Sequence, residues 1–449
     1  MKYITYQLVF FKSGKVLYKK SHFIQFLMIS TLLISASSFA VEQSLDHLSL
    51  KQSIQLFELN NREVLLAKRN VDGAEADILT AGQMPNPVLS IGASNLNLNT
   101  SKGNPSTENN NNLTSRNIQS VLQVSQLFER GDKRNLRIAA ANKAFSASQF
   151  DFKDTLRQQQ LTLKNAYYDL LLAQETEKIQ QINVELYAKS LNAAELRLKA
   201  GDVASSDVAR IKVDALRSQN DLRQSLANRQ KAQSNLAYLI GKENNANEIV
   251  VTDTWPSVNV DIVNQVDKAD FNNRPDILAA EIRTKQADDM RSLANSLKSR
   301  DITVDLAYQH FPGQEPGVGV NTIGATVSFP LFTNYEYQGE IGRAETNYYL
   351  AQDSKEQIKA LAIGERNRAE SDLTSAIDRA KRYDEQTLHE AQKVADAAEF
   401  AYQHGAIDVT DLLDARRTLR STQLDAATSH ADYAKSLAAW HAATQIEKN

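Results

Sequence analysis

The sequence contains no cysteine and has little glycine, proline or methionine. Its 449 residues include 16 Gly, 8 Pro and 4 Met. Without cysteine there are no disulfides, thiolate metal sites or thiol nucleophiles, and we expect no lipid anchor on an N-terminal cysteine. Glycine and proline are the residues that most often interrupt regular structure, so their scarcity predicts long uninterrupted elements.

The sequence also lacks an excess of one charge sign and lacks the common catalytic motifs. Lys and Arg number 51 against 54 Asp and Glu, for a net charge of -3, so nucleic acid is not an expected partner. There is no glycine-rich phosphate loop, no nucleophile elbow and no histidine pair at metal-ligand spacing. We therefore expect no enzymatic activity, no catalytic residue, no cofactor and no metal site. We expect His310 to be a surface or girdle residue and not a metal ligand.

The N-terminus carries the features of an export signal. Four lysines between positions 12 and 20 precede an apolar run over 23–35, and small residues follow at Ser38 and Ala40. This pattern predicts a signal peptide over 1–40, cut before Val41. The alternative, a membrane-spanning anchor, needs about 20 apolar residues. No later stretch is apolar enough for a transmembrane helix, so membrane insertion would have to use strands.

Short motifs recur in the same order in the two halves of the chain. Asn60-Asn61-Arg62 returns as Asn272-Asn273-Arg274, and Gly201 with Asp207 returns as Gly405 with Asp411. Matches in register predict an internal two-fold repeat. We place a first repeat over 41–240, an irregular equatorial segment over 241–270 and a second repeat over 271–449. Each repeat is expected to contain a helix, a strand pair (87–128 or 301–332) and a long helical hairpin.

The hairpins are expected to be very long. Residues 132–199 contain neither glycine nor proline, and a helix of this length spans about 100 Å. Apolar residues recur at seven-residue spacing, which is typical of a coiled-coil seam: Leu156, Leu163, Leu170, Val184, Leu191 and Leu198. We expect the two hairpins to turn at Gly201 and Gly405, because glycine readily takes the left-handed conformation that ends a helix.

Four segments alternate between apolar and polar residues, at about 87–98, 116–128, 301–311 and 321–332. The alternation predicts strands with one apolar and one polar face. A soluble, half-buried sheet would show the same pattern. The length of the segments suits tilted membrane strands, and an aromatic group gathers at one end, as in an interfacial girdle; it comprises Phe128, Phe329, Phe332, Tyr335 and Tyr337.

Four strands cannot close a barrel, and open edges are not tolerated in lipid because their amide and carbonyl groups would have no partner. Several chains must then contribute to one barrel, with apolar faces toward outer-membrane lipid and polar faces toward a water-filled lumen. Polar residues expected to line that lumen are Ser90, Gln119, Gln123, Asp305 and Thr326. The loops over 99–115 and 312–320 would face outward.

The mature chain resembles the TolC family of outer-membrane efflux ducts. The resemblance rests on Met84-Pro85-Asn86-Pro87, on Asn273-Arg274-Pro275-Asp276-Ile277, and on the stretch from Gly405 to Leu413. It implies a mainly α protein with a small β part. It also implies a homotrimer whose outer-membrane β-barrel, with four strands per chain, is continued by a coiled-coil α-helical barrel across the periplasm of a Gram-negative bacterium.

The resemblance further implies a passive exit duct that works with a periplasmic adaptor (membrane fusion) protein and an inner-membrane RND-type pump. Residues 308–314 and 338–341 resemble the CzcC and CusC branch, which serves heavy-metal export. Heavy-metal cations are therefore the first substrate hypothesis. Drug efflux and type I protein secretion stay open as alternatives, and so does a periplasmic coiled-coil adaptor from another class of protein.

The resemblance also implies a periplasmic gate. Asp411, Asp414 and Tyr402 match positions of the family's gate, whereas Ile407 stands where the family has a locking arginine. Asp207 in the first repeat is either a second gate residue or a helix cap. Asp411 is likewise open to either role, and capping is the preferred role for Asp408. Charged residues near the two turns are candidate adaptor contacts, and we expect them to be exposed: Arg197, Lys199, Arg210 and Arg416.

Overall fold

The computed structural model describes residues 45–94, 118–259, 273–311 and 320–444. The chain divides into two units, Met1–Leu45 and Asp46–Asn449, and the fold below is that of the second. The expected signal peptide over 1–40 and most of both expected outward-facing loops lie outside the described residues.

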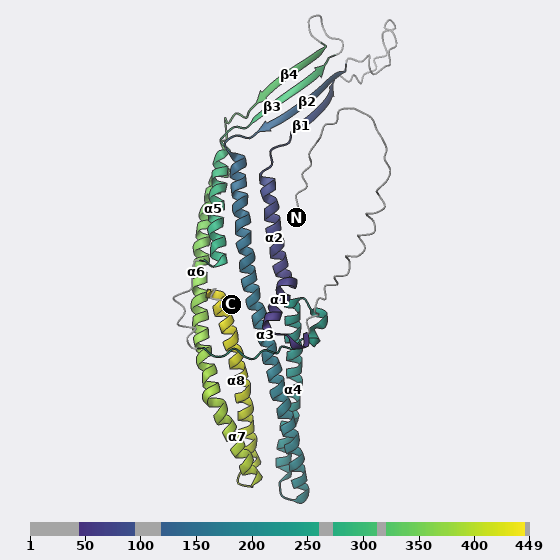
Figure 1. Ribbon diagram of the computed structural model, residues 1–449, viewed down its shortest axis with the longest axis vertical. Helices are drawn as coiled ribbons and strands as arrows, with labels where there is room; N and C mark the ends of the chain where they lie inside the picture. Colours follow the sequence, from purple (N-terminus) through teal and green to yellow (C-terminus); the bar gives the residue numbers. More distant parts are fainter. Residues whose placement is uncertain (1–44, 95–117, 260–272, 312–319, 445–449) are drawn as a thin grey trace, which may run out of the picture. The chain divides into compact units, whose positions relative to one another are not determined.

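Long helices make up most of the unit and one small sheet makes up the rest (Figure 1). The α-helices are α1 (Leu50–Asn60), α2 (Arg62–Ala81), α3 (Lys133–Ala200), α4 (Ser205–Ile240), α5 (Pro275–Ser296), α6 (Gln338–Arg382), α7 (Leu388–Gln403) and α8 (Val409–Thr444). Short 3-10 helices lie at Leu45–His47 and Glu243–Glu248, and a π-helical turn, η6 (Tyr383–Thr387), joins α6 to α7. The strands are β1 (Val88–Ser94), β2 (Gln119–Phe128), β3 (Ile302–His310) and β4 (Asn321–Ser328).

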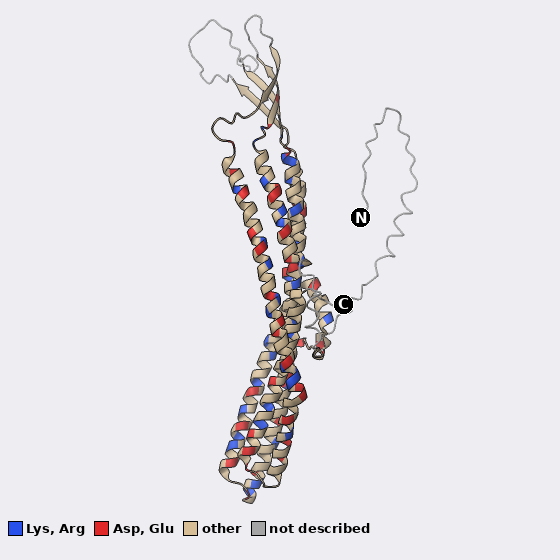
Figure 2. Cartoon of the chain, turned by 90° about the vertical axis from the view of Figure 1, so that its left-hand side faces the viewer, with Lys and Arg blue, Asp and Glu red and all other residues tan. Residues whose placement is uncertain are grey.

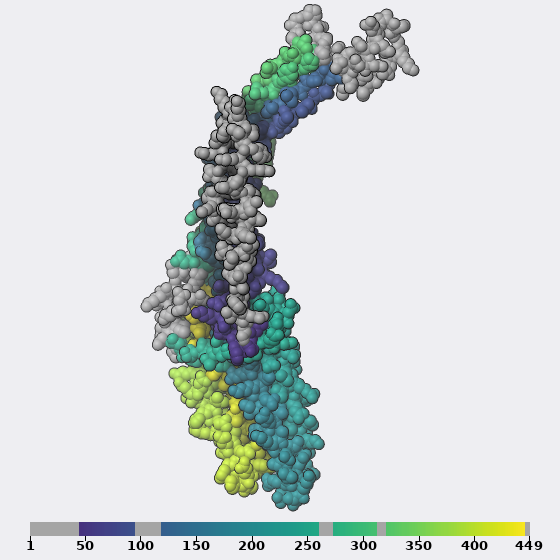
Figure 3. All heavy atoms as spheres, turned by 45° about the vertical axis from the view of Figure 1, so that its right-hand side comes forward, coloured from purple at the N-terminus to yellow at the C-terminus, as the bar shows by residue number. Residues whose placement is uncertain are grey.

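The helices pack as neighbours in a row. Near the sheet, α3 contacts α2 and α5, and α5 contacts α6; toward the hairpin turns, α3 contacts α4 and α8, and α8 contacts α7. The helix α3 takes part in the contacts near the sheet and in those near the hairpin turns, because its 68 residues correspond to a length of about 100 Å. Figure 3 shows the α3–α4 hairpin and the α7–α8 hairpin side by side at the end away from the sheet. Among the described residues, no helix is both long and apolar enough to cross a membrane.

The buried core follows the helix contacts instead of forming one central cluster. One group lies between α6 and α8 and includes Leu373, Ile377, Tyr433 and Trp440, together with several alanines. Small alanine side chains let neighbouring helices approach closely, so that little space separates the larger residues. A second group lies beneath the hairpin turns and is described with the candidate site.

The segment after α4 lies across the helices. Val251 pairs with Leu48 in an isolated parallel bridge, and its backbone N–H and carbonyl bond to the side chain of Gln174 on α3. The backbone of Asn259 donates to the Tyr433 hydroxyl of α8. This irregular segment, over 241–259 in the described part, therefore connects α3 with α8.

The sheet has the order β1-β2-β3-β4 and is antiparallel throughout. All four predicted strands are present in the described residues, and they pair as predicted; residues 95–98 of the first and 116–117 of the second lie outside the described residues. The fourth is shorter than expected: β4 ends at Ser328, whose partner is Thr303, and does not reach 332. The reason is that Pro330 has no N–H to donate to a neighbouring strand.

The strands join the helices through a tightly bonded junction. Gly131 and Asp132 both have positive φ, which turns the chain from β2 into α3. The buried Lys133 donates to Asp301 at 2.7 Å and to the Ser299 carbonyl at 2.9 Å. These bonds link the start of α3 to the segment before β3, so the sheet is held at the end of the helices.

Candidate functional site

The two hairpins turn at glycines in the left-handed conformation. Gly201, between α3 and α4, has φ of +84°, and Gly405, between α7 and α8, has φ of +71°. Apart from the glycine and its two chain neighbours, no atom lies within 4 Å of the position that a Cβ would take at either Gly201 or Gly405. Glycine is therefore favoured here by backbone conformation and not by lack of space.

An apolar cluster lies beneath both turns. It contains Tyr187 of α3, Ile211 of α4, and Val409 and Leu413 of α8, with Tyr402 packed against it. The ring of Tyr402 is half-buried, and the Arg197 guanidinium lies 5.5 Å from its centre. The predicted gate residue Tyr402 is thus part of a packed interface between the hairpins.

The predicted gate carboxylates lie around this cluster. Asp411 and Asp414 are both exposed on α8, and Asp207 is half-buried in the first turn of α4. Arg210 of α4 donates to the Thr410 hydroxyl of α8 at 2.9 Å, so the N-terminal ends of the two helices are in contact. The capping role expected for Asp408 is confirmed, because its carboxylate accepts from the backbone N–H groups of residues 410 and 411.

Ion pairs connect the two hairpins just beyond the turns. Arg417 of α8 bonds both carboxylate oxygens of Asp214 on α4, at 2.9 and 2.7 Å, and also bonds Asp414 at 3.0 Å. Further along the same helices, Arg420 bonds Asp221 at 2.7 Å. These inter-hairpin ion pairs hold α8 against α4.

Burial explains why Asp214 matters. Its side chain is only 6% exposed, and a buried carboxylate is costly unless a cation pairs with it. The bond to Asp214 raises the pKa of Arg417. Burial, with a smaller effect from Asp214, raises the pKa of the Tyr187 hydroxyl. Sequence reasoning missed Asp214, although a charge on the apolar stripe beside Ile211 and Ala215 was a usable signal.

Arg416 corrects an expectation. The sequence predicts an exposed adaptor contact here, but the side chain of Arg416 is only 6% exposed. It bonds Glu399 of α7 and donates to the Ser190 hydroxyl of α3 at 2.6 Å. The residue follows Ala415 on the buried side of α8, so its guanidinium enters a cavity of about 290 Å³ between the hairpins.

The sheet has two chemically different faces. Cross-strand partners point to the same face and alternate residues to opposite faces, so the register assigns each residue to a face. The five polar residues selected from the sequence share one face: Ser90 pairs with Gln123, Asp305 pairs with Thr326, and Gln119 pairs with Ser94. On this face Gln123 also donates to the Asp305 carboxylate at 3.0 Å.

The opposite face of the sheet is apolar, and the described residues leave it uncovered. Ile91 is 79% exposed and Ile323 is 84% exposed. Asp305 is the only Asp, Glu, Lys or Arg residue in the four strands, whereas Figure 2 shows charges of both signs along the helices. The sheet is therefore the part of the described chain that is least suited to water on both sides.

The aromatic group lies where the strands meet the helices. Phe332 and Tyr335 both contact Tyr337, with ring centres 5.4 and 6.0 Å apart. Phe128 and Phe329, at the ends of β2 and β4, are more than half exposed. Aromatic rings gather at this end of the sheet, as the sequence indicated.

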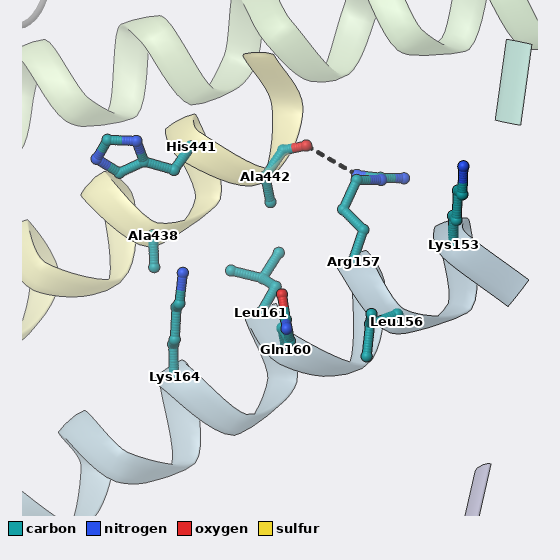
Figure 4. A pocket seen from close by; sticks show the side chains of 9 residues that line it. All are labelled: Lys153, Leu156, Arg157, Gln160, Leu161, Lys164, Ala438, His441 and Ala442. Atoms are coloured by element: carbon teal, nitrogen blue, oxygen red, sulfur yellow. Dashed lines mark hydrogen bonds between the residues drawn. The ribbon is translucent and has the colours of Figure 1, made fainter. Parts of the chain in front are cut away.

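A basic cleft of about 240 Å³ lies near the other end of α8 (Figure 4). Arg157 of α3 donates to the Ala442 carbonyl at 3.0 Å, and Lys164 points toward the turn that carries Ala438. Cations beside the last carbonyls of a helix offset the negative end of its dipole. We assign this cleft to anchoring α8. Within the described residues, no group of three or more His, Asp or Glu side chains is arranged to hold a metal ion.

Comparisons with known proteins identify relatives over most of the chain. The family model described as "Outer membrane efflux protein" matches residues 53–242 and 271–444. The cobalt-zinc-cadmium resistance protein CzcC of Cupriavidus metallidurans is 22% identical over 83% of this chain and 84% of its own. The pyoverdine export outer membrane protein OpmQ of Pseudomonas aeruginosa is 25% identical over 83% of this chain and 80% of its own.

Solved structures show the same fold. A crystal structure of CusC aligns with a TM-score of 0.71 over 88% of this chain and 91% of that one, at 18% identity. The family match covers both parts of the chain that contain a strand pair and a helical hairpin. The chain therefore belongs to the outer membrane efflux protein family, whose members are outer-membrane channels of Gram-negative bacteria and not enzymes.

Proposed function

We propose that three copies of this chain form an exit duct that passively conducts substrate from a pump and adaptor to the outside. The observation that carries the proposal is the sheet. Within the described residues β1 and β4 each have one neighbour, so both outer edges are open. In lipid, such edges need strands from other chains, and three chains would supply a closed twelve-stranded barrel.

The two faces of the sheet determine which side of this barrel would face lipid and which side would face the lumen. The face with Ile91 and Ile323 would contact lipid, and the face with Ser90, Gln123 and Asp305 would line the lumen. The row of helices continues from the sheet, and it leaves apolar residues such as Leu66 and Leu350 uncovered. Neighbouring copies would cover these residues and close the helices into a tunnel across the periplasm.

We also propose that each chain arose by internal duplication. The family model matches two separate segments, and equivalent motifs perform equivalent tasks in the two. Asn61 donates to the carbonyl of Leu239 near the end of α4, and Arg274 donates to that of Ala443 near the end of α8. Each motif thus binds the end of the second helix of its own hairpin, which supports repeats over 41–240 and 271–449 joined by the equatorial segment.

The hairpin turns would form the periplasmic gate. If copies of Asp411 and Asp414 converge on the axis, with Asp207 and Tyr402 behind them, their carboxylates favour cations over anions. Ile407 stands where the family carries a locking arginine. The inter-hairpin ion pairs of Arg417 and Arg420 supply a bond between α8 and α4 in its place.

Heavy-metal cations are the first choice of substrate. The resemblance to CzcC supports this choice, and the single strand charge, Asp305, would place carboxylates in the lumen. The similarity to OpmQ supports a second candidate, the export of a larger organic molecule. The partners would be a periplasmic adaptor and an inner-membrane RND-type pump.

Planar-bilayer recording of the purified full chain tests the gate and the duct together. Wild-type protein should give discrete, cation-selective channels of low conductance. The double variant Asp411→Ala with Asp414→Ala should show higher conductance and weaker cation selectivity. Unchanged traces in the double variant would remove the gate assignment, and absence of any channel from correctly folded protein would remove the duct.

A further inference from the structure

A cavity of about 690 Å³ lies between the two hairpins, beside the irregular segment. Its walls come from α3, α8, the start of α7 and residues 253–255, and they include Ile179, Ile182, Leu388 and Trp255. Pockets for small molecules have volumes of about 300 to 1,000 Å³ and mostly apolar walls. The cavity therefore has the size and the lining of a ligand site, and it contains none of the proposed gate or lumen residues.

Trp255 is held in a defined position in this wall. Its indole N–H donates to Glu175 of α3 at 2.6 Å. One side of its ring system stacks on Tyr168, with centres 6.2 Å apart and an interplanar angle of 27°. The His430 ring of α8 lies 6.2 Å away. A half-buried indole fixed by these contacts offers a flat aromatic surface at little further cost in side-chain entropy.

The helix beside the cavity is irregular. Leu388, which lines the cavity, directly follows the π-helical turn η6, and π-helical turns occur often at functional sites. Within that turn Asp384 bonds His430 Nε2 at 2.8 Å. The other ring nitrogen, Nδ1, is buried without a hydrogen-bond partner in the described structure. Such atoms are commonly accounted for by a bound water or ligand.

The charges around the cavity favour a cation. Glu175 and Asp253 line it, and Asp384 is bonded to its wall through His430, whereas Lys178 is the one ammonium or guanidinium group among the lining residues. A positive charge is also attracted by the face of an indole ring. We propose that this cavity binds a planar aromatic cation, stacked near Trp255 and held between the two hairpins.

The test uses a matched pair of probes with the full-length protein in neutral detergent. N-methylacridinium carries one positive charge on three fused rings, and anthracene-2-sulfonate carries one negative charge on a similar frame. We expect N-methylacridinium to quench Trp255 fluorescence saturably and anthracene-2-sulfonate to bind at least tenfold more weakly. The sequence has two tryptophans, and the other, Trp440, is 1% exposed and serves as an internal reference.

Variants of the charged residues should move the affinity in opposite directions. Glu175→Gln keeps an oxygen acceptor for the Trp255 indole but removes the charge, so N-methylacridinium should bind roughly fivefold more weakly. Lys178→Gln should tighten binding roughly threefold by the same argument. Glu185→Gln changes an exposed carboxylate on the same helix outside the cavity and should have no effect.

Saturation of the quenching separates a site from general partition of the dye into detergent, and Trp255→Phe, which removes the reporter, shows that the saturable signal comes from Trp255. The saturable quenching should vanish in this variant, while circular dichroism shows an unchanged fold. Equal affinity for the two probes, or equal affinity in Glu175→Gln, Lys178→Gln and wild-type protein, would overturn the proposal. So would quenching that rises linearly with dye concentration and persists in Trp255→Phe.

Discussion

The sheet and the hairpin turns lie at opposite ends of α3, and they differ in how much of their stability comes from within one chain. At the turns, Tyr187, Ile211 and Leu413 are nearly fully buried, and ion pairs link the hairpins. In the sheet, Ile323 is 84% exposed, and among the described residues both edges are open. The difference indicates that the hairpin end is packed within the chain itself, whereas the sheet is left with an uncovered apolar face.

The largest effect is expected from a charge on the apolar face of the sheet. Ile323→Lys should cost about 2 to 4 kcal/mol per chain if this face contacts lipid, and it should abolish the assembled form on gels run without heating. Its neighbour Thr322 belongs to the other face, so Thr322→Lys is a matched control and should leave assembly intact. Equal loss in both variants would show that the two faces do not differ as described.

The next largest effect is expected at the inter-hairpin ion pairs. Arg417→Ala leaves the buried Asp214 without its close partner, because Arg217 lies 3.9 Å away. We expect a loss of roughly 1 to 3 kcal/mol in thermal unfolding, together with higher single-channel conductance. Assembly on gels should be unchanged. Arg223→Ala, at an exposed position of α4, is the control, and identical behaviour of the two variants would count against the ion pairs as a connection between the hairpins.

A smaller effect is expected at the glycine turns. Gly405→Ala should destabilise by about 1 to 2 kcal/mol, because a left-handed backbone is strained for alanine even where there is space. Gly364 lies inside α6 with open space around it, so Gly364→Ala should stabilise by about 0.5 to 1 kcal/mol. Thermal unfolding of both variants measures the two changes in stability. Melting temperatures that shift in the same direction in Gly405→Ala and Gly364→Ala would contradict the different roles of the two glycines.

The smallest effect concerns alkaline pH. Burial raises the pKa of Tyr187 above that of an exposed tyrosine, so the unfolded chain loses this proton first. Stability from this group is therefore present below the ordinary tyrosine pKa of about 10 and is lost as pH rises beyond it. In melting curves recorded between about pH 9 and 11.5, the melting temperature of Tyr187→Phe should fall less steeply with pH than that of wild-type protein. Tyr238→Phe, at an exposed position, should follow wild-type protein.

Sequence reasoning located the strands better than it located the helix contacts. Alternation is a local pattern, so it identified β1 to β4 and placed five polar residues on one face. The seven-residue spacing along α3 predicted its buried residues less well, because α3 packs against α4 on one side and against α8 on another. Leu163 and Leu170 are buried, but Leu198 is 36% exposed, and Tyr187 and Ala194 are buried in the same region instead.

The residues that sequence reasoning missed or misplaced owe their roles to partners distant in the chain. Asp214, which it missed, pairs with Arg417, 203 residues away, and Arg416, which it placed at the surface, bonds Ser190, 226 residues away. The π-helical turn η6 contains no glycine or proline, the residues that would indicate an irregularity in a helix from sequence. Such features depend on how the two hairpins lie against each other, which no local pattern reports.

Disulfide cross-linking between copies tests the central claim most directly, because the chain has no cysteine of its own. One cysteine would replace Leu89, Ile91 or Ala93 of β1 and a second would replace Ile323, Ala325 or Val327 of β4. Two strands separate β1 from β4 within a chain, a distance of about 14 Å that no disulfide spans. We predict that at least one combination of two cysteines gives covalent dimers and trimers in the outer membrane. If the protein stays monomeric with every combination, the result would contradict a barrel shared between copies.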